Sequence, residues 1–396
     1  MLKNKLITPE GTRDLLFEDC MARRQVEARI KELLLNRGFS EIITPGIEFY
    51  DVFSSEEHGI AQEKMYKLTD QKGRLLALKP DLTMPVARVA ATRLKGQIRP
   101  LRLYYDQNIY AVSQALTGRS DETAQIGIEI IGASGRRTDL EVLVLAVEAL
   151  QSCGLTDFRL EIGHIGLFNT LIRRLNLSEE NAEEIRTLIQ TKNFPSLNDR
   201  LDRMADQETA SMLKQLPALF GGEEVFGQAA EILHFPELSS DMEALHSVYL
   251  SLSQLGLGDK LSIDLGIVNR NDYYTGIVFR GYVEGLGTTA LLGGRYDSLL
   301  SEYGSPEPAI GFSIDVDAVA KVLKSSLPAL PAPDVLVYAD EGYEVKALLE
   351  IRKLAAHGFT SEFSVFDSFD ASRRYALKKG IRTVYLVNDD LVEVRL

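Results

Sequence analysis

One short stretch of the chain carries polar side chains at the spacing that lets a strand present them together. In the run Gln125-Ile126-Gly127-Ile128-Glu129, a period of two residues places the glutamine, the glycine and the glutamate on one face. An amide and a carboxylate side by side suit an ammonium and an imidazole N–H, and the glycine between them allows close approach. A buried acid needs a partner, which a cationic ligand would supply. The pattern favours an amino-acid site, but a solvated polar sheet face has the same spacing.

Two further groups could complete such a site. Asp81, with Thr83 two residues later, could pair with the ammonium of an α-amino acid, or it could satisfy the free amides at the start of a helix. Tyr273 and Tyr274 are adjacent, so we expect one ring on each side of the backbone. One tyrosine would then line a pocket while the other packs.

The elements that must position these residues follow from hydrophobic periodicity and turn signals. Residues 15–37 have apolar positions at helical spacing, and Gly38 ends that helix. The other elements expected in this part of the chain are a strand at 39–45, a hairpin at 64–81 with its turn at 70–73, a helix at 83–95, strands at 102–112 and 124–131, and a buried helix at 139–153.

The rest of the chain changes character twice. Residues 165–255 are rich in Leu, Glu, Lys, Arg and Gln, with a helix start at Ser178, and predict an inserted helical domain. Residues 327–333 form a proline-punctuated linker. We therefore expect a core at 1–326 and a small α/β module at 334–396. The remaining expected elements are strands at 261–265, 274–283, 288–292, 335–338, 360–366, 382–387 and 392–396, and helices at 344–356 and 371–379.

The bulk composition excludes several classes of protein. No apolar run approaches the ~20 residues that cross a bilayer, and the N-terminus has no secretory signal. Cys20 and Cys153 are too few for a disulfide framework, which fits a cytoplasmic location. The five histidines are scattered, so we expect no metal and no cofactor. A net charge of −13 argues against non-specific binding of a polyanion.

Taken in order, these segments resemble the active-site motifs of histidyl-tRNA synthetase. The resemblance implies an α+β class II synthetase-like core, a mixed or antiparallel sheet flanked by helices, with a two-fold dimer interface at motif 1. Residues 334–396 then resemble a truncated anticodon-binding domain, but nine Lys/Arg against eleven Asp/Glu in residues 332–396 give no footprint for tRNA. The matching segments are 38–48 (motif 1), 79–88, 101–132 (motif 2 and the Gln125 strand), 272–276 (DYYTG), 292–297 (LGGRYD) and 309–313 (motif 3).

The same resemblance shows what has been lost. Where the enzyme carries the arginines that handle ATP and activated histidine, this chain reads Ala111, Asn269 and Ala318. Arg270 is one residue out of place, and on a strand such a slip points a side chain to the opposite face. Removing one group that stabilises a developing charge costs ~2.7–4 kcal/mol. Three such losses predict a protein that does not form an adenylate.

Two acids strengthen that expectation, because Asp315 and Asp317 would add negative charge where ATP would sit. The chain is identified as a member of the family with this profile, the regulatory subunits of ATP phosphoribosyltransferase. Membership implies a non-catalytic subunit of a glycosyltransferase complex that acts in the first step of histidine biosynthesis and mediates feedback inhibition by histidine. The implied partners are a short-form catalytic subunit, L-histidine as effector, and a second copy of this chain within a hetero-octamer of four subunits of each kind.

The site that the resemblance implies includes Arg119, which matches the motif 2 loop. Two other interpretations remain open. A divergent histidyl-tRNA synthetase would need Arg270 or Arg119 to replace the missing arginines, and a binding module on the same scaffold could regulate an unrelated process. The expected histidine-binding residues are Asp81, Thr83, Arg119, Gln125, Glu129, Tyr273 and Tyr274.

Overall fold

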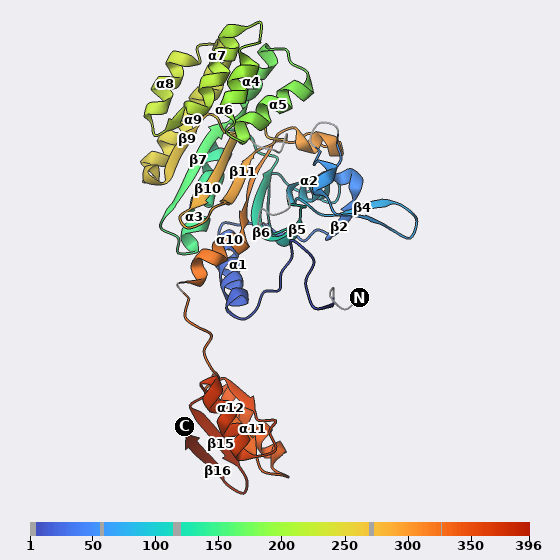
Figure 1. Ribbon diagram of the computed structural model, residues 1–396, viewed down its shortest axis with the longest axis vertical. Coiled ribbons are helices and arrows are strands. Elements are labelled where there is room, and N and C mark those ends of the chain that lie inside the picture. The colour runs from blue at the N-terminus through green and yellow to red at the C-terminus, as the bar shows by residue number, and fades with distance from the viewer. Residues whose placement is uncertain (1–4, 56–58, 114–119, 269–272, 326) are drawn as a thin grey trace. The chain divides into compact units, whose positions relative to one another are not determined.

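The chain divides into two compact units, Met1–Ser326 and Leu327–Leu396, whose elements are labelled in Figure 1. The computed structural model describes residues 5–55, 59–113, 120–268, 273–325 and 327–396.

Among the described residues, the first unit is built on a nine-stranded sheet in the order β1-β5-β6-β12-β11-β10-β7-β9-β8. Most neighbours are antiparallel, whereas β1 with β5 and β7 with β9 run parallel. The mixed sheet flanked by helices confirms the expected fold class. The strands are β1 (Ser40–Glu41), β5 (Leu101–Tyr110), β6 (Glu122–Ile131), β7 (Phe158–His164), β8 (Phe220–Gly221), β9 (Leu261–Asp264), β10 (Ile277–Val283), β11 (Thr289–Arg295) and β12 (Ala309–Asp315).

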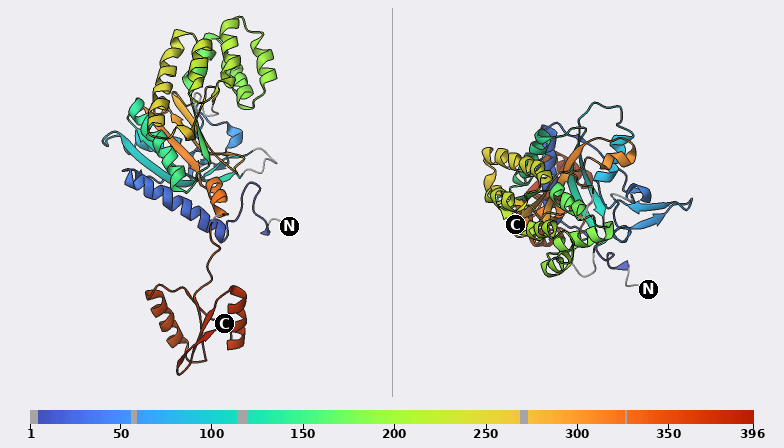
Figure 2. Two further views of the ribbon diagram at one scale, coloured as in Figure 1. Left: turned by 90° about the vertical axis from the view of Figure 1, so that its left-hand side faces the viewer. Right: turned by 90° about the horizontal axis from the view of Figure 1, so that it is seen from above.

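Three helices cover one face of this sheet: α1 (Glu18–Asn36), α3 (Arg136–Ser152) and α10 (Val316–Lys324). The view in Figure 2 shows α1 lying across the strands. Its Lys31 reaches Asp106 of β5 at 2.7 Å. Because side chains alternate along a strand, the neighbouring Tyr105 points to the other face, where the site lies.

The opposite side of the site is framed by α2 (Thr83–Ala91) and by a three-stranded sheet in the order β2-β4-β3. The expected hairpin at 64–81 is confirmed as β3 and β4, and Asp70 stabilises its turn by accepting from the Lys72 and Arg74 amides. The bounds of these strands and of the neighbouring 3-10 helices are β2 (Ile47–Phe49), β3 (Lys67–Thr69), β4 (Leu75–Leu78), η2 (Tyr50–Val52), η3 (Gln62–Lys64), η5 (Gly258–Lys260) and η6 (Leu299–Tyr303).

A layer of helices follows β7 in the chain. The start expected at Ser178 is confirmed, since its hydroxyl accepts from the Asn181 amide. The stretch is not wholly helical, because β8 within it pairs with β9 of the main sheet. Its last helix, α9, packs on α3 and β7. The elements are α4 (Ile165–Arg174), α5 (Glu179–Gln190), α6 (Phe194–Leu201), α7 (Gln207–Gln215), η4 (Leu216–Ala218), α8 (Glu224–Ile232) and α9 (Pro236–Gln254).

The second unit has a four-stranded sheet in the order β14-β13-β15-β16, with β16 antiparallel and the others parallel. One core lies under α11 and includes Val337 and Ala347, while the other lies under α12 and includes Leu336 and Ala376. Its elements are β13 (Val335–Ala339), α11 (Glu344–Ala356), β14 (Ser361–Phe363), α12 (Phe369–Lys379), β15 (Thr383–Val387) and β16 (Leu391–Arg395).

Three expectations about strands need correction. The strand expected at 39–45 is reduced to the two residues of β1, and beyond it the Thr44 amide donates to the Gln107 side chain instead of to a strand. The strand expected from Tyr274 begins at Ile277. Four strands, β2, β7, β8 and β12, had no counterpart among the expected elements. Within the described ranges, none of the helices combines the length and apolarity that crossing a membrane requires.

Candidate functional site

The centre of the candidate site is Glu129, a carboxylate that is 1% exposed on β6. Its Oε1 accepts a hydrogen bond from the Thr83 hydroxyl at 2.9 Å and a longer one from the Tyr105 hydroxyl at 3.4 Å. Its Oε2 accepts from the Tyr296 hydroxyl. Hydroxyl groups from three separate segments therefore fix the orientation of this carboxylate before any ligand arrives.

Burial also changes the protonation of the site. It raises the pKa of Glu129 to about 8, and the nearby Asp81 carboxylate adds to the effect. Burial likewise raises the pKa of Asp81 to about 6. The described residues give neither acid an ion-pair partner. A cation entering the site would favour the ionised forms of both acids, which is the electrostatic condition for binding an ammonium.

Asp81 fulfils one of the two roles considered for it, and its place in the cavity wall leaves it available for the other. Its Oδ1 accepts from the Met84 amide at 2.8 Å, so it satisfies one of the free amides at the start of α2. It also lines a cavity of about 360 Å³ in front of the main sheet. The helix start thus fixes the carboxylate at the cavity wall.

The cavity brings together six of the seven residues expected to bind histidine. The seventh, Arg119, lies outside the described residues. Glu183 also reaches the cavity from α5. The six residues are Asp81, Thr83, Gln125, Glu129, Tyr273 and Tyr274.

The two tyrosines do not alternate as expected. Both line the cavity, their ring centroids lie 4.8 Å apart, and their ring planes are inclined by 53°. The expectation assumed an extended strand, but this segment precedes β10 and is irregular. Both rings are largely buried, at 3% and 9% exposure, so each contributes a wall to the pocket.

Two glycines shape the site. A Cβ on Gly311 would overlap the Glu129 carboxylate, well inside the 3.0 Å that real contacts respect. A Cβ on Gly294 would come within 2.6 Å of the Tyr274 ring. Gly294, in the LGGRYD segment, thus makes room for the tyrosine ring that forms the cavity wall.

Sequence reasoning missed Tyr105, Tyr296 and Lys64, all of which line the cavity. A usable signal existed for Tyr105, because the pairing of β5 with β6 places it opposite Gly127, where a side chain would clash with its hydroxyl. Tyr296 lies in the LGGRYD segment but was not singled out. Lys64 belongs to the short η3, for which no pattern was recognised.

The positions of the missing arginines have two different surroundings. Ala111 lines the cavity. Ala318 lies in the first turn of α10, where its amide donates to Asp315 Oδ1 at 2.9 Å. The third position, Asn269, and the neighbouring Arg270 lie outside the described residues.

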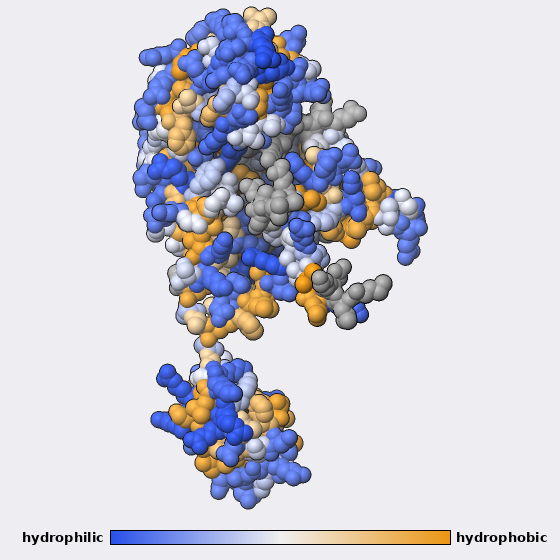
Figure 3. Space-filling view, in the orientation of Figure 1, coloured by the Kyte–Doolittle hydropathy of each residue, from blue (hydrophilic) through white to orange (hydrophobic). Residues whose placement is uncertain are grey.

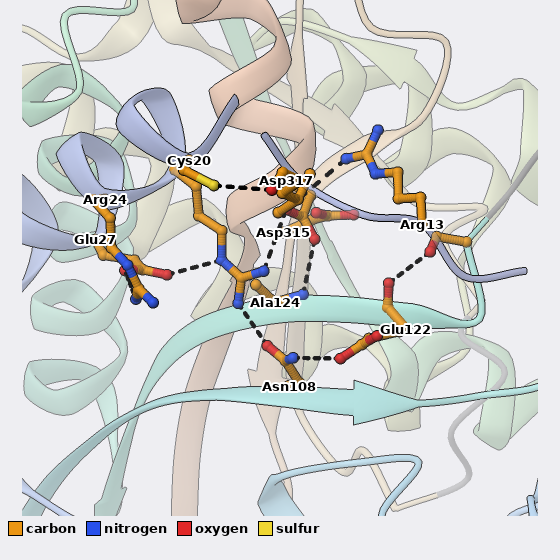
Figure 4. A network of polar contacts seen from close by, with 12 residues as sticks. Arg13, Cys20, Arg24, Glu27, Asn108, Glu122, Ala124, Asp315 and Asp317 are labelled. Carbon is orange, nitrogen blue, oxygen red and sulfur yellow. Dashed lines mark hydrogen bonds and ion pairs between the residues drawn. The ribbon is translucent and has the colours of Figure 1, made fainter. Parts of the chain in front are cut away.

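Asp315 and Asp317, which were expected to add negative charge where ATP would sit, do not line the cavity. Asp317 turns toward the face covered by α1, where it accepts from the Ala124 amide at 3.1 Å. It also lies 3.8 Å from the Arg23 guanidinium and 4.0 Å from that of Arg13. Figure 4 shows this network of polar contacts around α1, β5 and α10. Asp315 caps the start of α10, and Asp317 in its first turn faces α1.

Comparison with known proteins places this fold and cavity in a class. A family model described as histidyl-tRNA synthetase matches residues 11–319. A solved histidyl-tRNA synthetase from Nostoc superposes with a TM-score of 0.76 at 20% identity, covering 98% of this chain and 96% of that one. At that identity the likeness concerns the fold alone. The first unit thus has the histidyl-tRNA synthetase fold.

More similar sequences carry another name. An ATP phosphoribosyltransferase regulatory subunit from Clostridium kluyveri is 40% identical over 94% of this chain and 97% of its own length. One from Clostridium acetobutylicum is 37% identical over 97% and 96%. A solved structure from Bacillus halodurans, an ATP phosphoribosyltransferase regulatory subunit/histidyl-tRNA synthetase, has a TM-score of 0.83 and 28% identity, over 96% of this chain and 97% of that one. The chain belongs to the family of ATP phosphoribosyltransferase regulatory subunits.

Proposed function

We propose that the chain is a histidine sensor without catalytic activity of its own, acting on a short-form ATP phosphoribosyltransferase catalytic subunit. Free L-histidine occupies the cavity around Glu129, and its binding inhibits the partner enzyme. In this way the end product of the pathway controls its first step. No cofactor, metal or tRNA takes part.

The observation that carries this proposal is the contrast in charge within one cavity. Glu129 and Asp81 present carboxylates suited to an ammonium and an imidazole N–H. Ala111 stands where the synthetase would hold the transferring phosphate with an arginine. A site with the first feature and not the second binds the amino acid without stabilising the charge that forms during adenylation.

The proposed assembly is a hetero-octamer of four regulatory and four catalytic subunits, in which this chain forms homodimers through the motif 1 region. An exposed apolar surface supports the dimer contact, since Ile47, Phe49, Leu68 and Leu75 of the three-stranded sheet are each 40–48% exposed. Hydrophobic side chains gather over β2 and β4 in Figure 3. Apolar patches of this kind mark protein contacts.

Inhibition requires that histidine bind more tightly to one state of the assembly than to another. The same coupling must then work in reverse, so that the catalytic subunit alters the affinity for histidine. A regulatory subunit that bound histidine equally well in both states would not change the activity of the catalytic subunit.

Calorimetric titration of the full chain with L-histidine tests the proposal. We expect saturable one-site binding, weakened about 100-fold or more in Glu129→Ala because a buried charge-assisted contact is lost. Tyr274→Phe should weaken it by about 5- to 10-fold, since one hydroxyl is removed. Tyr282→Phe, a matched change further along β10, should leave binding unchanged.

Absence of histidine binding to both the isolated chain and its complex with the catalytic subunit would refute the proposal. So would binding that Glu129→Ala leaves intact. In the complex, the same variant should make phosphoribosyltransferase activity insensitive to histidine while leaving its basal rate unchanged.

A further inference from the structure

The cavity has acids for the cationic parts of an amino acid, but a free amino acid also brings a carboxylate. Among the described residues that line the cavity, the acidic and basic side chains are Asp81, Glu129, Glu183 and Lys64. Glu183 is paired with Arg186 at 3.0 Å. An α-carboxylate placed beside the other two acids is repelled unless a cation faces it. Among the described residues that line the cavity, Lys64 is the one lysine or arginine.

The position of Lys64 suits that task. Its carbonyl accepts from the Val112 amide at 2.9 Å, and the next residue, Met65, forms a β-bridge with Ala111. Lys64 therefore lies beside the position where the synthetase motif has an arginine and this chain has alanine.

Strand register places Lys64 and Glu129 toward opposite ends of the cavity. Glu129 pairs with Leu103 near the start of β5, whereas Ala111 follows the last residue of that strand. An amino acid whose cationic groups are bound at the Glu129 end directs its carboxylate along the strand toward Ala111. A lysine has a four-carbon stem and three rotatable N–H donors, so its ammonium can keep an existing contact and still bind a carboxylate.

We propose that Lys64 binds the α-carboxylate of the amino acid and makes the cavity selective for free histidine over its amides and esters. This inference rests on the proposed function, because it assigns the third charged contact of the same ligand. Its consequence is that the sensor responds to the free amino acid and discriminates against forms in which the carboxyl group is blocked.

The test is a pairwise comparison of two ligands on the full-length chain. L-Histidine and L-histidinamide differ in the charge of one group, and each is titrated into the wild type and Lys64→Ala. We expect the wild type to prefer histidine by about 10- to 100-fold, the size of a contact between charged groups. Lys64→Ala should lower the affinity for histidine by that factor and change the affinity for histidinamide less than about twofold.

Three further variants separate charge recognition from structural damage. Lys64→Arg should preserve the preference, because a guanidinium also binds carboxylates. Lys67→Ala, an exposed lysine three residues away on β3, is the matched control and should behave as the wild type. Adding Ala111→Arg to Lys64→Ala should restore part of the preference by placing a cation beside the lost one.

Two results would overturn the inference while leaving the histidine sensor intact. The first is an equal fall in the affinity for both ligands in Lys64→Ala, which would assign the lysine a structural role. The second is an unchanged preference in Lys64→Ala that disappears in Arg119→Ala, which would give the contact to that arginine. If the wild type bound neither ligand, the proposed function itself would fail together with this inference.

Discussion

The two ends of the cavity have been built in different ways. At one end, Glu129 is held by hydroxyl groups from three segments and fitted against Gly311. At the other end, the wall of the cavity is formed by Ala111, whose side chain is a single methyl group, and by Lys64 of η3. Under the proposed function, recognition of the amino acid would depend on many residues fitted together, whereas nucleotide chemistry would depend on single long cations. Point substitutions could then remove the second function and leave the first in place.

Two acids of the first unit, Asp317 and Glu129, differ in whether the protein itself places cations beside them. Asp317 lies within 4.0 Å of two guanidinium groups and accepts an amide hydrogen bond, so its charge is compensated within the protein. The described residues supply no such cation to Glu129, whose pKa is raised to about 8. Under the proposed function, a cationic ligand would supply the charge that compensates Glu129.

The largest effect should come from filling the space beside Glu129. Gly311→Ala places a methyl group on the carboxylate and on the Ile128 carbonyl, so the caged end must shift. We expect histidine binding to fall by at least about 100-fold and stability to fall by about 1–3 kcal/mol. Calorimetry and urea unfolding measure the two effects. Retained affinity would show that the cage is not needed for recognition.

A smaller effect is expected on how the stability of the folded chain depends on pH. Because burial raises the pKa of Glu129 from 4.5 to about 8, the folded, ligand-free chain binds more protons than the unfolded chain between those values. Stability should therefore fall as pH rises from 5 to 8. Glu129→Gln cannot ionise, so its loss of stability over this range should be smaller, although Asp81 contributes in the same direction below about pH 6. Urea unfolding at several pH values measures this loss of stability. An equal dependence of stability on pH in the wild type and Glu129→Gln would contradict the raised pKa of Glu129.

The smallest effect on the site should come from a substitution on the face of the main sheet that α1 covers, where the charge of Asp317 is compensated. Arg23→Ala removes hydrogen bonds to Asn108 at 2.6 Å and to Glu27 at 3.0 Å, and one guanidinium near Asp317. We expect a loss of about 1–2 kcal/mol in stability, as for partly exposed hydrogen bonds, and no change in histidine affinity. Thermal unfolding and calorimetry separate the two. A large loss of binding would mean that the two faces of the sheet are coupled.

Much of the site could be predicted from local patterns. The alternation Gln125, Gly127, Glu129 on one strand placed the glutamine and the glutamate at the cavity correctly. The residues that were missed depend on contacts between distant segments. Tyr296 reaches Glu129 from 167 positions away in the sequence, and no local period encodes that pairing.

The predicted placements were wrong where a regular strand was assumed but the chain is irregular or begins a helix. Tyr273 and Tyr274 were assigned opposite sides because a strand was assumed where the chain is irregular. Asp317 was placed in the nucleotide region, but the start of α10 turns it toward α1. In the fold, β7 was missed because Phe158–His164 lies between two helical segments and its pairing with β10 is non-local.

The proposed sensor binds histidine without activating it. Histidine-dependent ATP–pyrophosphate exchange tests this directly, on a preparation that calorimetry has shown to bind histidine saturably. We expect no exchange above the protein-free background at saturating histidine and ATP. Exchange that depends on histidine and is abolished by Glu129→Ala would contradict it, and would identify the cavity as a synthetase active site.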